Sequence, residues 1–262
     1  MFNFPKIMIA AMDRTGHHAI SIWLMHQQLG VSEFELKTIT QWLFYLPTQD
    51  KMSFLLNNPL VKDENQHPDK LNFDRIITDY CNANPTNLII ATHEQHSLKD
   101  VAWACGTSDV FATDTRFVVV LRDFKNWAAS CIKMAGRDGK PYDKLVNDKK
   151  VEMYKDHCKF FLESSDLAGI EYILFNQWFS SEKYRRELAE RLNLTFTDAA
   201  INQESPFGGG SSFDKMEYLK TASLMKVNDR YKQMESHPVY DRIIKENKEA
   251  LEISNEIFTN SD

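Results

Sequence analysis

The sequence predicts an α/β fold in which helices flank both faces of a central, mostly parallel sheet. Three observations lead to this class: short apolar runs typical of buried strands, amphipathic stretches between them, and turn residues at the junctions. The chain of 262 residues is long enough to enclose one large core, and no linker composition divides it. We therefore expect a single domain over residues 1–262.

The first half of the chain contains three predicted strands. The apolar run at residues 7–12 breaks into an Arg-Thr-Gly turn, after which an amphipathic stretch continues through Leu29 as a helix. The pattern between residues 31 and 67 is irregular. The other elements expected here are a helix at residues 71–81, a strand at 88–92, a helix at 97–105 and a strand at 117–121.

The second half of the chain continues this alternation. Turn residues predict a surface loop at residues 136–141, and a helix at 151–163, a strand at 172–175 and a helix at 182–194 follow it. Late helices are expected at residues 214–225 and 241–258. The last of these carries a predicted buried stripe formed by Ile243, Ile244, Leu251 and Ile257.

Composition narrows the possible function classes. A hydrophobic share of 43% and a charged share of 26% are ordinary for a globular protein, and the net charge of −6 argues against nucleic acid or a heparin-like polymer as partner. No segment approaches the roughly 20 apolar residues that a membrane span requires. The first predicted strand starts almost at Met1, which leaves no room for a signal peptide, so we expect a cytoplasmic protein without a membrane span.

The cysteines point to the same compartment. The chain has four, which form no close pair and no metal-ligand cluster: Cys81, Cys105, Cys131 and Cys158. We expect reduced, structural thiols and no metal ion.

The turn after the first predicted strand has the features of an anion site. Unpaired N–H groups and the helix dipole favour negative charge at a helix N-terminus. Gly16 permits the tight turn, and Arg14 adds a forked donor that can meet two phosphoryl or sulfuryl oxygens at once. Taken alone, an Arg-Thr-Gly turn is more often an ordinary strand-to-helix connection. The motif therefore needs support from elsewhere in the chain.

A second segment supplies that support. The apolar strand at residues 117–121 ends in Arg122, and Ser130 follows eight residues later on a predicted helix. Ligands in open α/β sheets bind beyond the carboxyl ends of the strands. An arginine and a helical serine at this position suit one phosphate group.

Together the two segments resemble the nucleotide-binding signature of the sulfotransferase family, whose members use 3′-phosphoadenosine 5′-phosphosulfate (PAPS). Arg14, Thr15 and Gly16 are similar to the family's 5′-phosphosulfate loop. Arg122 and Ser130 are similar to its 3′-phosphate pair and have the family's spacing. The resemblance implies a P-loop-like sulfotransferase fold.

Two histidines mark a departure from the family pattern. The family usually has two threonines after the loop glycine, whereas this chain has His17 and His18. Capture of phosphate by backbone N–H groups survives this change. His17 and His18 either contact phosphate or sulfate oxygens themselves or are surface residues of the first helical turn.

The proposed base lies at the end of the strand at residues 88–92. Thr92 and His93 resemble the Lys-Thr-His of cytosolic sulfotransferases, whose histidine acts as general base, although Ala91 replaces the lysine. The resemblance implies that His93 is the base. Glu94 is the substitute, because other branches of the family use a glutamate.

Two later segments extend the resemblance. Residues 176–178 occupy the place of the family's usual Tyr-Glu-Asp. Residues 205–213 sit where the family has a glycine-containing loop that closes over the nucleotide, and the candidate contacts there are Gly208, Gly209, Gly210, Ser211 and Ser212. No arginine or lysine lies within this loop, so only its backbone and hydroxyl groups could serve.

The resemblance implies a reaction and leaves two alternatives open. A sulfuryl group would pass from PAPS to a small-molecule or glycan acceptor and leave adenosine 3′,5′-bisphosphate, with no metal required. The aromatic residues between 42 and 54 either line the acceptor pocket or pack under an insertion. The alternatives are a noncatalytic nucleotide-binding protein of the same fold and an ATP-dependent P-loop kinase. The kinase needs Gly-Lys followed by Ser or Thr, which this chain lacks after Gly16.

Overall fold

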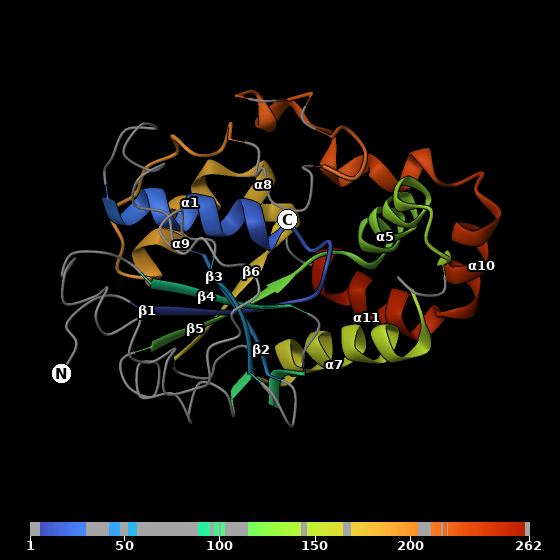
Figure 1. Ribbon diagram of the computed structural model, residues 1–262, viewed down its shortest axis with the longest axis horizontal. Coiled ribbons are helices and arrows are strands. Elements are labelled where there is room, and N and C mark those ends of the chain that lie inside the picture. The colour runs from blue at the N-terminus through green and yellow to red at the C-terminus, as the bar shows by residue number, and fades with distance from the viewer. Residues whose placement is uncertain are drawn as a thin grey trace.

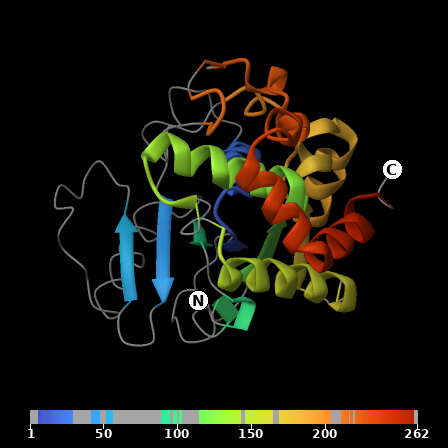
Figure 2. The same cartoon turned by 90° about the vertical axis from the view of Figure 1, so that its right-hand side faces the viewer.

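The sheet is mostly parallel, as the sequence predicts. The computed structural model describes residues 6–29, 42–47, 52–56, 89–94, 97–99, 101–102, 115–142, 146–164, 169–203, 211–215, 217–218 and 220–259. Within these residues the strands are β1 (Lys6–Ala11), β2 (Trp42–Pro47), β3 (Met52–Leu56), β4 (Ile89–Glu94), β5 (Thr115–Leu121) and β6 (Ile170–Leu174). They form one sheet in the order β3-β2-β4-β1-β5-β6 (Figure 1). Only the β2–β3 pair among them is antiparallel, and it forms one edge of the sheet, away from the C-terminal helices (Figure 2).

Helices cover both faces of the sheet (Figure 1). On one face lie α1 (His17–Leu29), α8 (Phe175–Ser180) and α9 (Glu182–Arg191), and on the other lie α5 (Phe124–Asp138), α7 (Asp148–Ser164), α10 (Pro238–Glu246) and α11 (Lys248–Thr259). Two short 3₁₀ helices, η2 (Ala222–Leu224) and η3 (Val227–Gln233), precede α10. None of the helices in the described part of the chain is long and apolar enough to cross a bilayer.

The alternation of side chains along β1 divides the core in two. Ile7 and Ile9 are buried against α1, α8 and α9, whereas Met8 and Ala10 are buried on the face covered by α5, α7, α10 and α11. Successive strand residues point to opposite faces, and a parallel strand buried on both faces is apolar throughout. This is why residues 7–11 form an unbroken apolar run.

The register brings three strand ends to one edge of the sheet. Ala11 at the end of β1 lies level with Glu94 at the end of β4 and with Val120 near the end of β5. The segments that follow β1 and β5, with Arg14 and Arg122, therefore start from neighbouring points. This edge is the expected ligand-binding edge of such a sheet.

Some boundaries differ from the sequence predictions. The surface loop expected at residues 136–141 begins later, because α5 continues to Asp138 and ends at Gly139, a C-cap with a φ of 63°. Residues 42–47 and 52–56, within the stretch expected to be irregular, form the paired strands β2 and β3. The predicted helix at 71–81 lies outside the described residues.

The helix expected at residues 214–225 is wrong. Ser211 and Lys215 instead form an isolated β-bridge, and Lys215 and Lys220 have positive φ angles. The Ser211 hydroxyl oxygen accepts hydrogen bonds from the backbone N–H groups of Phe213 and Asp214. Such local side-chain bonds compete with helical hydrogen bonding.

The final predicted helix is two helices, which meet at Asn247. Its backbone leaves the helical region, with a φ of −114° and a ψ of 49°, and its side-chain amide donates to the carbonyl of Ile243. The predicted apolar stripe is retained: Ile243 and Ile257 are buried, while Ile244 and Leu251 pack against the same core. Cys131 and Cys158 are free and buried, and the other cysteines lie outside the described residues.

Candidate functional site

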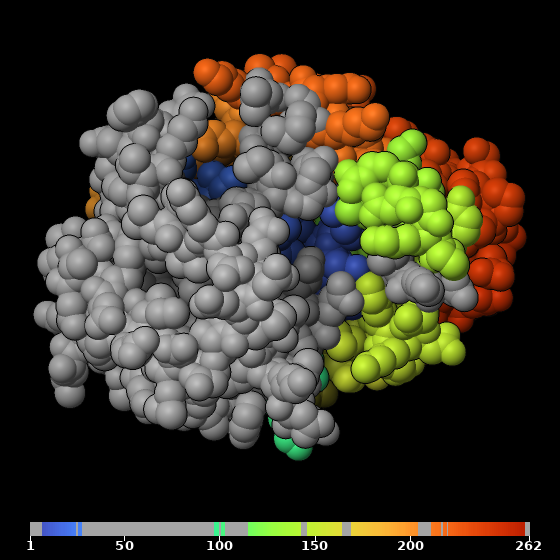
Figure 3. Space-filling view, in the orientation of Figure 1, coloured from blue at the N-terminus to red at the C-terminus, as the bar shows by residue number. Residues whose placement is uncertain are grey.

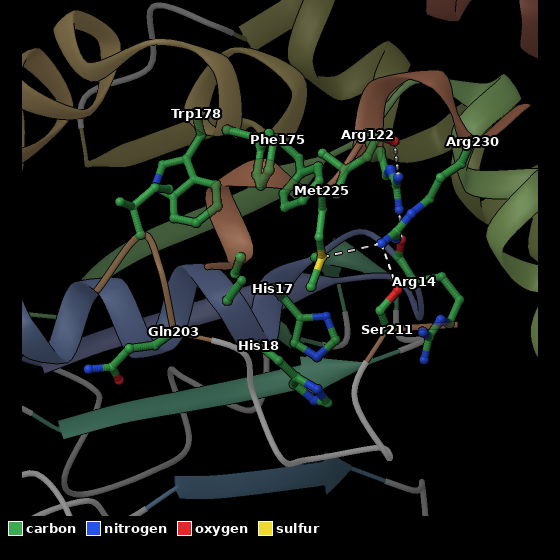
Figure 4. A pocket seen from close by; sticks show the side chains of 16 residues that line it. Arg14, His17, His18, Arg122, Phe175, Trp178, Gln203, Ser211, Met225 and Arg230 are labelled. Atoms are coloured by element: carbon green, nitrogen blue, oxygen red, sulfur yellow. Dashed lines mark hydrogen bonds between the residues drawn. The ribbon is translucent and has the colours of Figure 1, made fainter. Parts of the chain in front are cut away.

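A pocket opens where β1 and β5 end. Its volume is about 130 Å³, well above the roughly 10–15 Å³ that one water molecule needs. In the space-filling view the N-terminal segment is visible in a recess beside α5 (Figure 3). The polar wall of the pocket includes Arg14, His17, His18, Arg122, Ser211 and Arg230 (Figure 4). The apolar wall of the pocket includes Phe175, Trp178, Phe179, Ile201, Met225 and Val227.

The loop after β1 is held by its carbonyl groups. Three consecutive carbonyl oxygens each accept a side-chain hydrogen bond: that of Met12 from Thr15 Oγ1 at 2.7 Å, that of Asp13 from Trp127 Nε1 at 2.9 Å, and that of Arg14 from Arg122 Nη1 at 3.0 Å. The loop is therefore tied to the end of β5 and to α5. Its conformation does not depend on its own short sequence alone.

Two left-handed residues shape this loop. Arg14 has a φ of 66° and Gly16 a φ of 93°. A Cβ atom on Gly16 would lie 2.1 Å from Cε2 of Phe175, so glycine is required there by contact as well as by backbone angle. Helix α1 begins at His17, and its N-terminal turn therefore adjoins the pocket.

Arg122 is the most enclosed charge of the pocket. Its side chain is 2% exposed, Nη2 donates to the carbonyl of Val227 at 2.8 Å, and the guanidinium lies 5.0 Å from the ring centre of Phe175. Burial, and then the nearby charge of Arg230, lower the pKa of Arg122 to about 9. The guanidinium still carries its charge at neutral pH, in surroundings that favour an added anion.

Ser130 lies behind Arg122. Nη1 of Arg122 donates to Ser130 Oγ at 3.1 Å, and the serine is fully buried. The two residues paired from the sequence are thus in direct contact, but only Arg122 lines the pocket. The Ser130 hydroxyl therefore contacts the Arg122 guanidinium and does not itself line the pocket.

Arg230 is a pocket residue that sequence reasoning missed. It comes from η3 and is 7% exposed. Its Nη2 donates to Ser211 Oγ at 2.7 Å and to Asp214 Oδ2 at 2.9 Å. It lies 108 residues beyond Arg122, and no motif in its sequence neighbourhood marks it.

The pocket carries an excess of positive charge. The buried Nε atoms of Arg14 and Arg122 have no hydrogen-bond partner, and within the described residues neither guanidinium forms an ion pair with a carboxylate. His17 adds no charge, because burial, and then the Arg14 guanidinium, lower its pKa to about 3. Buried charges are normally paired, so the buried Arg122 guanidinium, with the half-buried Arg14 beside it, could accommodate an anion.

The opposite wall is aromatic. Phe175 and Trp178 stack with ring centres 5.7 Å apart and an interplanar angle of 27°, and Trp23 meets Trp178 edge-on. Both wall residues belong to α8, which begins directly after β6. The pocket thus joins a side rich in arginine to a flat apolar side (Figure 4).

The segment that departs from the Tyr-Glu-Asp pattern has a structural role. Asn176 donates from Nδ2 to Asp123 Oδ2 at 2.7 Å, and its carbonyl accepts from Asn228 Nδ2 at 3.2 Å. It thereby connects the end of β5 with η3. Trp178, from the same segment, lines the pocket.

The remaining predicted site residues fall into two groups. Thr15 and Ser212 are buried and do not line the pocket described above. Gly208, Gly209 and Gly210 lie outside the described residues. His93 and Glu94 occupy the last two positions of β4, level with Ala10 and Ala11 of β1. Their assignment as base stays a prediction.

Comparison with known proteins shows the fold. The sulfotransferase domain from the Synechococcus PCC 7002 olefin synthase matches with a TM-score of 0.52 and 10% identity, over 97% of this chain and 94% of that one. The sulfotransferase domain from the curacin biosynthetic pathway matches with a TM-score of 0.52 and 12% identity, over 92% of this chain and 97% of that one. Comparisons with protein families and with curated proteins find no match. The chain has the sulfotransferase fold, as its sequence predicts.

Proposed function

We propose that this protein is a sulfotransferase that moves the sulfuryl group of PAPS to a hydroxyl or amine acceptor. One observation carries the proposal. Arg14 and Arg122, from the loops after adjacent parallel strands, line one pocket, and their buried Nε atoms have no hydrogen-bond partner. A nucleotide with phosphate groups on both its 5′ and 3′ oxygens supplies the two anions that such a pocket favours.

The arginines take separate roles in this proposal. Arg14 and the N-terminal turn of α1 bind the 5′-phosphosulfate, where negative charge grows as the bond to sulfur breaks. Arg122, oriented by Ser130, binds the 3′-phosphate. Arg230 lies close enough to lower the pKa of Arg122 and joins the same anion site.

Phe175 and Trp178 provide the surface for the adenine ring. Their stacked rings form a flat, apolar wall, and Phe175 also lies beneath the Arg122 guanidinium. An aromatic base gains from such offset stacking. The arrangement supports a nucleotide whose base lies on the aromatic side and whose phosphates lie among the arginines.

The transfer itself needs one proton acceptor. An acceptor oxygen or nitrogen forms a bond to sulfur, the bond between sulfur and the 5′-phosphate oxygen breaks, and the electron pair leaves with adenosine 3′,5′-bisphosphate. We assign the released proton to His93, with Glu94 as the substitute. Both residues lie in β4 level with the end of β1, which leads into the Arg14 loop.

The state of His17 disfavours the kinase alternative. It stands directly after the loop glycine, where a P-loop kinase has a lysine that reaches the β- and γ-phosphates. With a pKa of about 3, the buried imidazole is neutral and cannot supply that charge. The noncatalytic alternative shares the same nucleotide site and differs only in turnover.

The setting of the reaction forms part of the proposal. The free, buried thiols of Cys131 and Cys158 are consistent with the reducing cytoplasm. The acceptor is a small molecule or a glycan. Arginine charges replace a metal ion in neutralising the phosphates, so transfer should continue in the presence of a chelator.

Calorimetry tests the nucleotide assignment. Adenosine 3′,5′-bisphosphate should bind at least 10-fold more tightly than AMP, because a charge-assisted hydrogen bond contributes roughly 1.5–3 kcal/mol. Arg122→Ala should remove this preference, with a loss of AMP affinity much smaller than the loss of bisphosphate affinity, because Arg122 also bonds the Arg14 carbonyl. Arg242→Ala, at an exposed arginine on α10, is the control. Equal wild-type affinities for the two nucleotides would contradict the assignment.

Turnover separates the enzyme from its alternatives. Radiolabelled PAPS incubated with a panel of hydroxyl and amine acceptors should yield a labelled product in the presence of EDTA. Tight binding of the bisphosphate without any transfer would favour the noncatalytic protein. Phosphate transfer from ATP that requires Mg²⁺ would favour the kinase.

A further inference from the structure

A buried ion pair involves Asp13, in the loop between β1 and α1, and Lys150 of α7. Lys150 Nζ on α7 is 2.7 Å from Asp13 Oδ2, and the side chains of the two residues are 11% and 8% exposed. Neither residue lines the pocket. The pair therefore acts on the pocket only through its neighbours.

Asp13 is held from two directions. Its carboxylate contacts Lys150 of α7, and its carbonyl accepts a hydrogen bond from Trp127 Nε1 of α5 at 2.9 Å. The next residue is Arg14, whose φ of 66° is uncommon for a residue with a side chain. Such a conformation persists only where its surroundings determine it. The two contacts on Asp13 supply that constraint on one side, and the Arg122 contact with the Arg14 carbonyl supplies it on the other.

Stability alone does not explain the pair. Burying two charges costs desolvation energy that their attraction often only offsets, and apolar pairs of similar volume are commonly as stable. What an ion pair adds is a defined geometry. Here that geometry applies to the residue immediately before Arg14.

We propose that Lys150 is a positioning residue of the transfer site: through Asp13 it holds the Arg14 backbone in the conformation that directs the guanidinium to the 5′-phosphate. The inference rests on the proposed function, since it requires a 5′-phosphate in the pocket. It assigns no contact between Lys150 and the substrate. Loss of Lys150 should therefore weaken recognition at the 5′ end of the nucleotide and spare the 3′ end.

Two mononucleotides separate these ends. Calorimetry with 5′-AMP and with 3′-AMP measures each phosphate site by itself. Lys150→Met should lower 5′-AMP affinity by about 5- to 10-fold and change 3′-AMP affinity by less than 2-fold, and Lys150→Arg should restore most of the loss. A lysine that served only to stabilise the fold would affect both nucleotides alike.

The same helix offers a matched control. Lys155 has a side chain that is 12% exposed, and its Nζ pairs with Glu152 of the same helix and with the exposed Glu249 of α11 at 2.7 Å, away from the loop after β1. Lys155→Met should change neither affinity. Because Lys150→Met removes the lysine that faces the buried Asp13 carboxylate, the double variant Asp13→Asn/Lys150→Met is measured as well, with circular dichroism to verify the fold. It too should lose 5′-AMP affinity selectively.

The outcomes distinguish the two claims. If wild-type protein binds both mononucleotides and the folded Lys150 variants keep full 5′-AMP affinity, or lose both affinities equally, the positioning role is overturned and the proposed function stands. If wild-type protein binds neither mononucleotide nor the bisphosphate, the proposed function fails, and the inference with it.

Discussion

The Nη1 atom of Arg122 donates to the hydroxyl oxygen of Ser130 at 3.1 Å, and the same nitrogen donates to the carbonyl of Arg14 at 3.0 Å. One guanidinium nitrogen thus joins the helix after β5 to the loop after β1. Because Ser130 is fully buried, its hydroxyl reaches the pocket only through Arg122. The spacing of eight residues places the serine behind the arginine.

Replacing this serine should affect one phosphate selectively. Ser130→Ala removes one of the three acceptors of the Arg122 guanidinium and loosens its orientation, so affinity for adenosine 3′,5′-bisphosphate should fall by roughly 5- to 10-fold, the equivalent of a hydrogen bond of about 1 kcal/mol. AMP affinity should stay nearly constant. Ser254→Ala, at another buried serine, which accepts from the Phe124 N–H, is the control in the same titrations.

Alanine substitutions at two glycines with positive φ compare the cost of backbone strain alone with the cost of strain plus a steric overlap. Gly16→Ala should destabilise the protein by more than 2 kcal/mol, because its φ is positive and the new Cβ would overlap Phe175. Gly139 also has a positive φ, of 63°, but no atom lies within 4 Å of the Cβ that Gly139→Ala would add. That variant should therefore lose only the strain energy of about 1–2 kcal/mol in its free energy of unfolding. Urea unfolding measures both. Equal losses would show that Phe175 yields to the added methyl group.

Stability should fall as the pH falls, partly because of His17. Its pKa is about 3 in the folded protein and 6.5 ordinarily, so between these values the unfolded chain binds a proton that the folded protein does not. The free energy of unfolding should therefore decrease by up to about 1.4 kcal/mol per pH unit from this group as pH drops below 6.5. His17→Gln should show a shallower slope in urea unfolding between pH 7 and 4.5. Parallel slopes would place a charged, exposed imidazole at this position.

The general base can be assigned by two variants. His93→Ala should slow transfer to a hydroxyl acceptor by about 10²–10⁴-fold, the usual contribution of general base catalysis, and leave bisphosphate binding intact. Glu94→Gln should retain activity. The reverse pattern in a radiolabelled transfer assay would make Glu94 the base, and loss of nucleotide binding in His93→Ala would show a structural role instead.

Much of the central layer follows from local sequence. The runs at residues 7–11 and 117–121 are apolar because strands buried on both faces exclude polar side chains, and the Arg-Thr-Gly turn shows where the first of them ends. These signals act over a few residues. They were sufficient for the parallel sheet, for the class of fold, and for the location of Arg14 and Arg122 directly after strands.

The sequence predictions were wrong where contacts between residues far apart in the chain determine the local structure. The described residues of 214–225 form no α-helix, and Ser211, Asp214 and Arg230 bond to one another there, an arrangement that no window of sequence contains. The sequence also showed no sign of Arg230 as a pocket residue, because its place there depends on contacts with residues distant in the chain. Stretches of this kind gain their hydrogen bonds from tertiary neighbours, and local periodicity does not register them.

The sequence by itself determined the alternation of strands and helices, the sulfotransferase resemblance and the two strand-end arginines, because periodicity and short motifs are properties of neighbouring residues. Only the tertiary structure decided which atoms those arginines contact: that Ser130 lies behind Arg122, that Arg230 completes the pocket, and that Lys150 reaches Asp13 across 137 positions of chain. Burial creates these relationships. A charge removed from water must find its partner wherever the fold provides one.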